Sequence, residues 1–91
     1  IHVPVLLEFR GQESAAGVAA DLSLGGVLIQ SPTVPPFGTE LTIIGDFPGA
    51  VALRLPAVVR WVSPGGFGAQ FGLLGAREAH ALTALVHGPR T

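Results

Sequence analysis

The chain has 91 residues, a formal net charge of −1 and five Arg with no Lys, so we expect one domain over residues 1–91 with a thin core. The near-neutral charge excludes the basic face that a general DNA- or RNA-binding protein needs. The chain has no cysteine, which excludes disulfides and thiolate zinc sites and favours the reducing cytoplasm. No apolar run is long enough to predict a membrane span.

Strand-like segments fill the first half of the chain. Apolar and polar residues alternate with a period of two from residue 1 to 10, which is typical of a half-buried strand. Further short strands are expected at residues 15–22, 27–30 and 41–44. Residues 11–14 predict a turn, and the proline-rich residues 31–39 predict a loop.

The longest predicted strand covers residues 50–62, between turns at 45–49 and 63–66. Its alternation predicts an inward face and an outward face that carries Arg54 and Arg60; the inward face comprises Val51, Leu53, Leu55, Ala57, Val59 and Trp61. Pro56 lacks an amide donor and therefore predicts a bulge or an unpaired edge. A sixth strand follows, with one face made of Phe67, Ala69 and Phe71. Trp61, Phe67 and Phe71 could form an aromatic platform on which bases stack, but their inward registers on paired strands favour packing in the core, which is what we expect.

Only residues 76–87 predict a helix, which Gly88-Pro89 would end. Its apolar face is expected to carry Ala79, Leu82, Leu85 and Val86, and its polar face Arg77, His80 and His87. Six short strands and one terminal helix predict an all-β protein, either a small antiparallel barrel or a sandwich.

A polar segment interrupts the apolar sequence at residues 21–26, Asp-Leu-Ser-Leu-Gly-Gly. A carboxylate at Asp21, a hydroxyl at Ser23 and a bare α-carbon at Gly26 stand at fixed offsets where two strands meet. Such a set can hold a polar ligand against a sheet, and it can equally make a turn without any ligand. The residues themselves leave both interpretations open.

Nothing in the chain predicts catalysis or a metal site. His80 and His87 are seven residues apart, whereas metal-binding pairs on a helix are usually three or four apart. The serines lack a G-x-S-x-G motif. We therefore expect no enzyme activity, no metal and no cofactor.

The order of several motifs resembles the PilZ domain family. Asp21-x-Ser23-x-x-Gly26 is similar to the D/N-x-S-x-x-G signature of that family, and residues 2–5, His-Val-Pro-Val, resemble the entry to its first strand. Residues 58–62 and 66–71 resemble its paired late strands, and a closing helix follows in both. The resemblance implies a six-stranded antiparallel β-barrel with one C-terminal helix, and a receptor for the bacterial second messenger cyclic di-GMP.

The resemblance also implies a ligand site. Asp21 would accept hydrogen bonds from a guanine edge, Ser23 would donate to a phosphate or to the guanine, and Gly26 would permit either a positive φ or the close approach of a ring. The residues expected to bind the ligand are His2, Asp21, Ser23, Gly25 and Gly26.

The second family signature, R-x-x-x-R, is not present. Its second arginine would align at or beside His2, and its first would precede Ile1. Because the chain starts at Ile1 and has no Met, we expect further residues before Ile1 in the whole protein. Without two charge-assisted contacts of about 1.5–3 kcal/mol each, cyclic di-GMP binding should be weakened by about two powers of ten or more.

Two functions remain in view from the sequence. The first is a cyclic di-GMP receptor, and the second is a nucleotide-independent adaptor of the same fold that binds proteins in motility, pilus or envelope signalling. Apolar residues make up 48% of the chain and charged residues 12%, which favours contact with a protein partner or a second copy. A general bias toward Ala, Gly, Pro and Val explains the same numbers.

Overall fold

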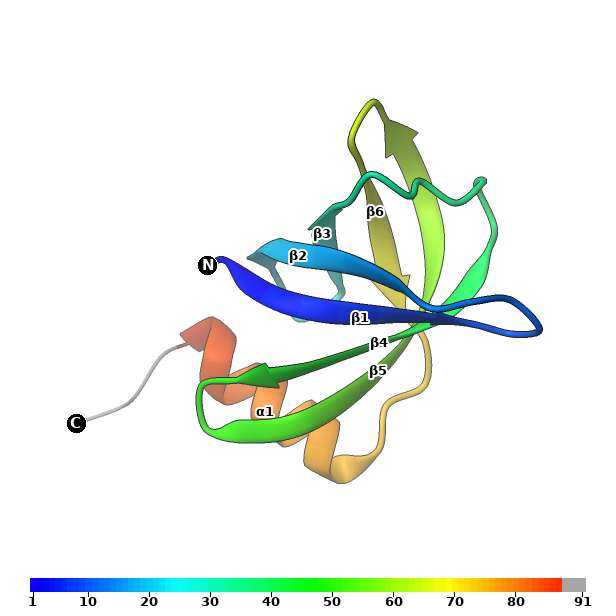
Figure 1. Ribbon diagram of the computed structural model, residues 1–91. Helices are drawn as coiled ribbons and strands as arrows, with labels where there is room; N and C mark the ends of the chain where they lie inside the picture. The colour runs from blue at the N-terminus through cyan, green and yellow to red at the C-terminus, as the bar shows by residue number, and fades with distance from the viewer. Residues whose placement is uncertain (88–91) are drawn as a thin grey trace.

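The computed structural model describes residues 1–87, in which six strands precede one helix. The elements are β1 (Val3–Phe9), β2 (Ala15–Leu22), β3 (Gly26–Gln30), β4 (Glu40–Phe47), β5 (Ala50–Ser63), β6 (Gly66–Phe71) and α1 (Ala76–His87). The strands close into a barrel in the order β1-β2-β3-β6-β5-β4, and each neighbouring pair is antiparallel (Figure 1). The predicted six-stranded barrel with a C-terminal helix is confirmed.

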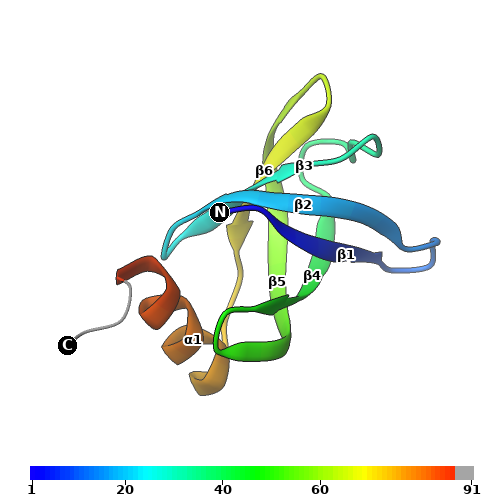
Figure 2. The same cartoon turned by 60° about the vertical axis from the view of Figure 1, so that its left-hand side comes forward.

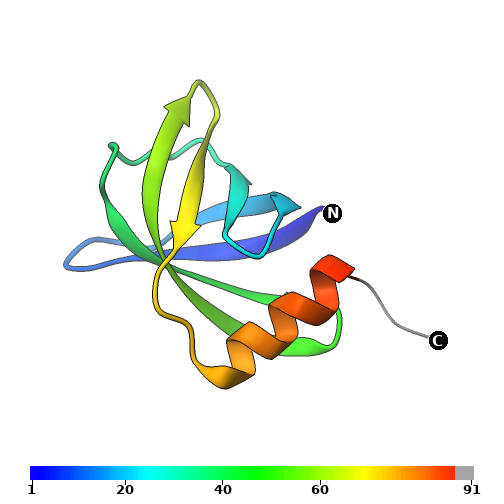
Figure 3. The ribbon, with the colours of Figure 1, turned by 180° about the vertical axis from the view of Figure 1, so that it is seen from behind.

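Alternate positions of the strands fill the interior, as the period of two predicts. The largest fully buried side chains are Leu7, Ile29, Ile43, Leu53, Leu55, Val59, Phe67 and Leu82. Leu82 comes from α1, which lies across one end of the barrel next to the β4–β5 hairpin (Figures 2 and 3). The helix therefore closes the core at that end.

β4 is longer than the sequence predicted. The expected turn at residues 45–49 begins later, because Gly45 continues the ladder and pairs with Val5 on β1 and Leu53 on β5. A Cβ atom at Gly45 would lie 2.9 Å from Val5 Cγ1. The strand runs on to Phe47, which is buried. A glycine that permits close packing was thus misread as a turn residue.

Two residues of β5 do not face the core as predicted. Val51 is 71% exposed, and the next residue, Ala52, has φ 53°, which breaks the alternation at the start of the strand. Trp61 also points outward, because a bulge precedes it in β5. Pro56 pairs with Thr42 on β4, whereas pairing with β6 begins only at Ala57. The expected unpaired position is therefore found on the β6 side alone, where the Pro56 carbonyl accepts from the Gly72 amide.

The predicted bounds of α1 are confirmed, but its buried face is different. Ala81, Leu82 and Leu85 pack against the core, whereas Ala79 and Val86 are exposed. The predicted stop at Gly88-Pro89 lies outside the described residues.

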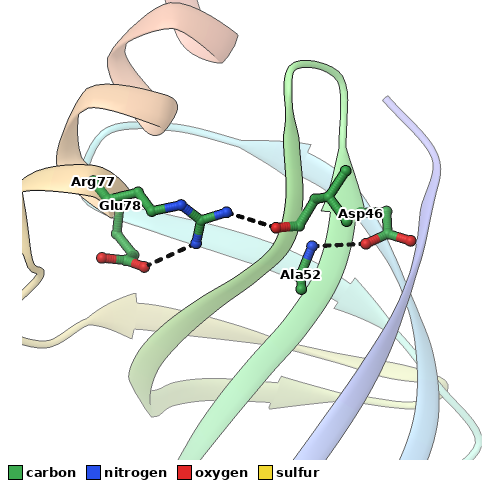
Figure 4. Close-up of polar contacts among 5 residues, drawn as sticks. Asp46, Ala52, Arg77 and Glu78 are labelled. Carbon is green, nitrogen blue, oxygen red and sulfur yellow. Dashed lines mark hydrogen bonds and ion pairs between the residues drawn. The ribbon is translucent and has the colours of Figure 1, made fainter.

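Polar contacts join α1 to the β4–β5 hairpin (Figure 4). Arg77 Nη2 donates to the Val51 carbonyl at 2.6 Å, and the Ala52 amide donates to Asp46 Oδ1 at 2.7 Å. These contacts hold the irregular start of β5 between the helix and β4.

Candidate ligand-binding site

The polar segment at residues 21–26 forms the tip of the β2–β3 hairpin. Ser23 closes this tip, because its amide donates to the Gly26 carbonyl at 2.9 Å and its hydroxyl accepts from the Gly26 amide at 3.1 Å. The same hydroxyl also lies 3.3 Å from the Gly26 carbonyl, to which it can donate. In this structure Ser23 therefore serves the turn.

Gly26 is needed for close packing. A Cβ atom there would lie 2.5 Å from the Ala69 carbonyl oxygen of β6. Positive φ, one of the two reasons expected for this glycine, is not found; within the barrel its close neighbour is the backbone of β6. Gly25 differs, since a Cβ atom there would have no neighbour within 4 Å; its carbonyl accepts from the Phe71 amide at 2.9 Å. Both glycines bring the hairpin tip close to β6.

A β-bulge at Ala20 sets the direction of Asp21. The β2–β3 register shifts between Ala19 and Asp21, so that Asp21 pairs with Leu28. Ala19 is buried inside the barrel, and regular alternation would point Asp21 inward as well. The extra residue re-aims Asp21 to the outer surface, as bulges commonly do near functional sites.

Asp21 is exposed, and its contacts leave part of the carboxylate open. Its Oδ1 atom accepts from the Leu22 amide at 2.9 Å. Within residues 1–87, its other oxygen accepts no hydrogen bond. That oxygen can therefore accept from a ligand.

A second bulge, at Arg60, turns the Trp61 side chain to the outer surface. The β5–β6 register shifts between Val59 and Trp61, so that Trp61 pairs with Gly68. Val59 is fully buried, and without the shift Trp61 would point into the core, as the sequence predicted. The prediction of core packing is wrong for this residue, which is 49% exposed.

The Trp61 indole lies against Gly68 on the outer face of β6. A Cβ atom at Gly68 would clash with Trp61 Nε1, and two ring carbons would lie 2.7 Å away. A side chain at this position would lift the ring from the barrel. Gly68 therefore holds the indole against the surface with its other face open.

The two bulges place their residues in one row across the outside of the barrel. Asp21 pairs with Leu28, Leu28 with Gly68, and Gly68 with Trp61. The row spans β2, β3, β6 and β5, which lie side by side in Figure 3. Asp21 and Trp61 thus stand at opposite ends of a four-strand row.

A groove follows this row; we call it the Asp21 groove. It encloses about 440 Å³, within the range of small-molecule sites. It is lined by Asp21, Leu22, Ser23, Gly25, Gly26, Val27, Leu28, Arg60, Trp61, Gly68, Ala69 and Gln70. Arg60 Nε donates to Gln70 Oε1 at 3.0 Å, which orients the guanidinium in the groove. The groove therefore combines a carboxylate, a guanidinium and an aromatic face.

Four of the five predicted ligand residues line this groove, and His2 does not. His2 is exposed just before β1, while the amino group of Ile1 lies 3.4 Å from the Ala20 carbonyl, next to Asp21. The sequence analysis missed Arg60, Trp61, Gly68 and Gln70. One signal was available: a glycine inside a strand, between inward-facing Phe67 and Ala69, indicates close approach by another group.

Other polar residues stand apart from the groove. Arg54 Nη2 donates to Glu8 Oε1 at 2.9 Å on the outer surface, and His80 and His87 are exposed on α1. Among the described residues, no cluster of three metal-ligating side chains occurs. No helix within residues 1–87 has the length and apolar character needed to cross a membrane.

The family model for the PilZ domain matches residues 1–88. The chain therefore belongs to the PilZ domain family, whose members are generally cyclic di-GMP receptor modules.

The fold is similar to the crystal structure of the PilZ domain of CeSA from a cellulose synthesizing bacterium, with a TM-score of 0.76 and 23% identity over 96% of this chain and 91% of that one. At this level of identity the likeness shows the fold. None of the curated proteins compared with the chain matches it.

Proposed function

We propose that this domain is a receptor for cyclic di-GMP and that the Asp21 groove binds one of its guanines. The observation that carries the proposal is the row in which Asp21 and Trp61 face outward on either side of Leu28 and Gly68. The resemblance pointed to the Asp21 end alone. The Trp61 end adds an independent feature suited to a purine.

Asp21 supplies hydrogen-bond acceptors. The Watson–Crick edge of guanine presents two donors, N1–H and the exocyclic amine, and an ionised carboxylate is an acceptor only. Because Asp21 is exposed and one of its oxygens has no partner among the described residues, it can accept from this edge without breaking an internal contact of the barrel. Charge-assisted bonds of this kind are stronger than neutral ones.

Trp61 supplies a stacking surface. Its ring rests on Gly68, so the barrel fixes one face and leaves the other accessible. Stacking of a base on an aromatic side chain is worth about 1–3 kcal/mol. A ring held in place before binding loses little conformational freedom when a ligand arrives.

Arg60 supplies the positive charge. Gln70 engages Arg60 Nε, and the terminal nitrogens of the guanidinium have no hydrogen bond among residues 1–87. They are suited to a phosphate oxygen or to guanine O6 and N7. One arginine, however, replaces only part of what two arginines of an R-x-x-x-R motif would provide.

We therefore expect weak binding by the 91-residue chain, with a dissociation constant above about 1 µM. Arginines before Ile1 in the whole protein would lie close to the groove, because the Ile1 amino group is next to Ala20 and Asp21. In such a receptor the preceding segment would become ordered around the ligand and transmit the signal. Titration calorimetry of residues 1–91 tests this, and a sub-micromolar constant would contradict the need for the arginines.

Asp21→Ala in the full-length protein tests the receptor proposal itself. Loss of the carboxylate should weaken cyclic di-GMP binding by about 10- to 100-fold. Glu13→Ala is the matched control, since Glu13 is an exposed carboxylate in the β1–β2 turn and does not line the groove. If both variants bind the nucleotide as the wild type does, Asp21 is only a turn residue and the proposal fails.

The second candidate is a nucleotide-independent adaptor that binds a protein in motility, pilus or envelope signalling. One observation favours it: the Ser23 hydroxyl is already engaged in closing the hairpin tip. Full-length protein that shows no calorimetric response to cyclic di-GMP would favour this candidate. Both candidates make the domain a binding module rather than an enzyme, and we propose that it acts in the bacterial cytoplasm, where the messenger is produced.

A further inference from the structure

The Asp21 groove has the length of a single base. Asp21 on β2 and Gly68 on β6 stand in one row with β3 between them. Because neighbouring strands are about 4.8 Å apart, the backbones of these two residues are about 10 Å apart. A single purine that stacks on the Trp61 ring above Gly68 and reaches the Asp21 carboxylate fills this length. The volume of the groove, about 440 Å³, also lies in the lower part of the range for small-molecule sites.

The groove offers one stacking face. A Cβ atom at Gly68 would lie 2.7 Å from both carbons that flank the Trp61 indole nitrogen, and the nitrogen would be nearer still. Both carbons are too close for an approach along the N–H bond, so one face of the ring lies on β6 and only the other face remains for a base. Among residues 1–87, no other aromatic residue lines the groove.

The groove also offers one positive charge. Arg60 is the only cationic side chain among the described residues that line it. Gln70, which accepts from Arg60 Nε at 3.0 Å, follows Gly68 by two residues on β6, a separation of about 7 Å along a strand. The guanidinium therefore stands beside the position of the base, where the phosphate of the same nucleotide can reach it.

We propose that the Asp21 groove binds a single guanine nucleotide, so that residues 1–91 bind a guanine mononucleotide nearly as well as cyclic di-GMP. The inference rests on the receptor proposal. Cyclic di-GMP has two identical halves, each with one guanine and one phosphate, whereas the groove offers one exposed carboxylate, one ring face and one guanidinium. The second half of the ligand therefore gains no matching contact in the groove. Arginines before Ile1 would then be the groups that select the cyclic dinucleotide.

Nuclear magnetic resonance titration of nitrogen-15-labelled residues 1–91 tests the proposal. The single tryptophan gives one indole N–H resonance, which reports on this groove. Cyclic GMP is the probe, because it carries one guanine and one phosphodiester with the same single charge as each phosphodiester of cyclic di-GMP. Since cyclic di-GMP presents two equivalent halves, we expect it to bind about twofold more tightly than cyclic GMP, and within about fivefold.

The outcomes separate this inference from the receptor proposal. Cyclic di-GMP that shifts the resonance and binds more than about fivefold more tightly than cyclic GMP overturns the inference and leaves the receptor proposal in place. If neither nucleotide shifts the resonance at concentrations up to about 5 mM, both fail.

Matched ligands and variants test whether one base and one phosphate are recognised. Guanosine, which lacks the phosphate, and cyclic AMP, which lacks the two adjacent donors of the guanine edge, should each bind about 10-fold more weakly than cyclic GMP. Arg60→Ala should remove the advantage of cyclic GMP over guanosine. Arg54→Ala is the control, since Arg54 pairs with Glu8 on the outer surface and does not line the groove. An advantage that persists in Arg60→Ala overturns the proposal, because another group then holds the phosphate.

Discussion

The two sides of the Asp21 groove contribute in different ways. On the β2–β3 side, most of the signature residues maintain the hairpin: Ser23 closes its tip and Gly26 packs on β6. On the β5–β6 side, Trp61 keeps an open ring face, and the terminal guanidinium nitrogens of Arg60 have no hydrogen bond within residues 1–87. The signature segment thus mainly shapes the groove, with Asp21 as its exposed acceptor, while β5 supplies the aromatic ring and the guanidinium.

The largest expected effect is a difference in the free energy of unfolding between a variant in the barrel interior and a variant in this groove. Phe67→Ala should lower the free energy of unfolding by about 3–5 kcal/mol, because Phe67 is fully buried and its loss leaves a cavity. Trp61→Ala, six residues earlier, should cost about 1 kcal/mol, because half of the ring is already in water. Urea denaturation of both variants measures the difference. Equal losses would mean that Trp61 belongs to the core after all.

Two neighbouring glycines in the signature segment are expected to differ in how much they contribute to stability. Gly26→Ala should destabilise the fold by about 1–3 kcal/mol, because the new Cβ atom meets the Ala69 carbonyl, which cannot move without distorting β6. Gly25→Ala meets nothing and should change stability by no more than about 0.5 kcal/mol. Urea denaturation distinguishes the two, and a neutral Gly26→Ala would show that this glycine is not required for packing.

The smallest effect concerns the orientation of Arg60. Gln70→Ala removes the acceptor of Arg60 Nε and should weaken cyclic di-GMP binding about 2- to 10-fold, as expected for one hydrogen bond. Arg60→Ala should weaken cyclic di-GMP binding by at least as much. In the double variant the Gln70 change should have no further effect, since its role is to position Arg60. Calorimetry of the three variants in the full-length protein tests this, and additive losses would indicate that Gln70 contacts the ligand directly.

The sequence was sufficient for the barrel and for half of the groove. Period-two alternation located β1, β5 and β6, whereas β2, β3 and β4 were predicted as short segments between turns and loops. The spacing of Asp21, Ser23 and Gly26 identified the hairpin. The bulge at Arg60 was not predictable, since an extra residue leaves the local sequence looking regular while it reverses the direction of every later side chain. Trp61 was therefore assigned to the wrong face.

The bulge at Ala20 illustrates the same limit. By alternation Asp21 would lie inward with Ala19, and its polar character alone indicated a surface position. The resemblance to the PilZ family supplied that residue, whereas no motif pointed to Trp61. Side-chain direction after a bulge depends on the paired strand, which a single segment of sequence does not reveal.

The central claim is that Asp21 and Trp61, re-aimed by separate bulges, serve one ligand. Trp61 is the only tryptophan and the chain has no tyrosine, so the intrinsic fluorescence of residues 1–91 reports on this groove alone. On titration with cyclic di-GMP to about 1 mM, the account predicts a saturable change in Trp61 emission that Asp21→Ala greatly reduces and Glu13→Ala does not. Emission that stays constant throughout the titration, or a change that persists unaltered in Asp21→Ala, would contradict it.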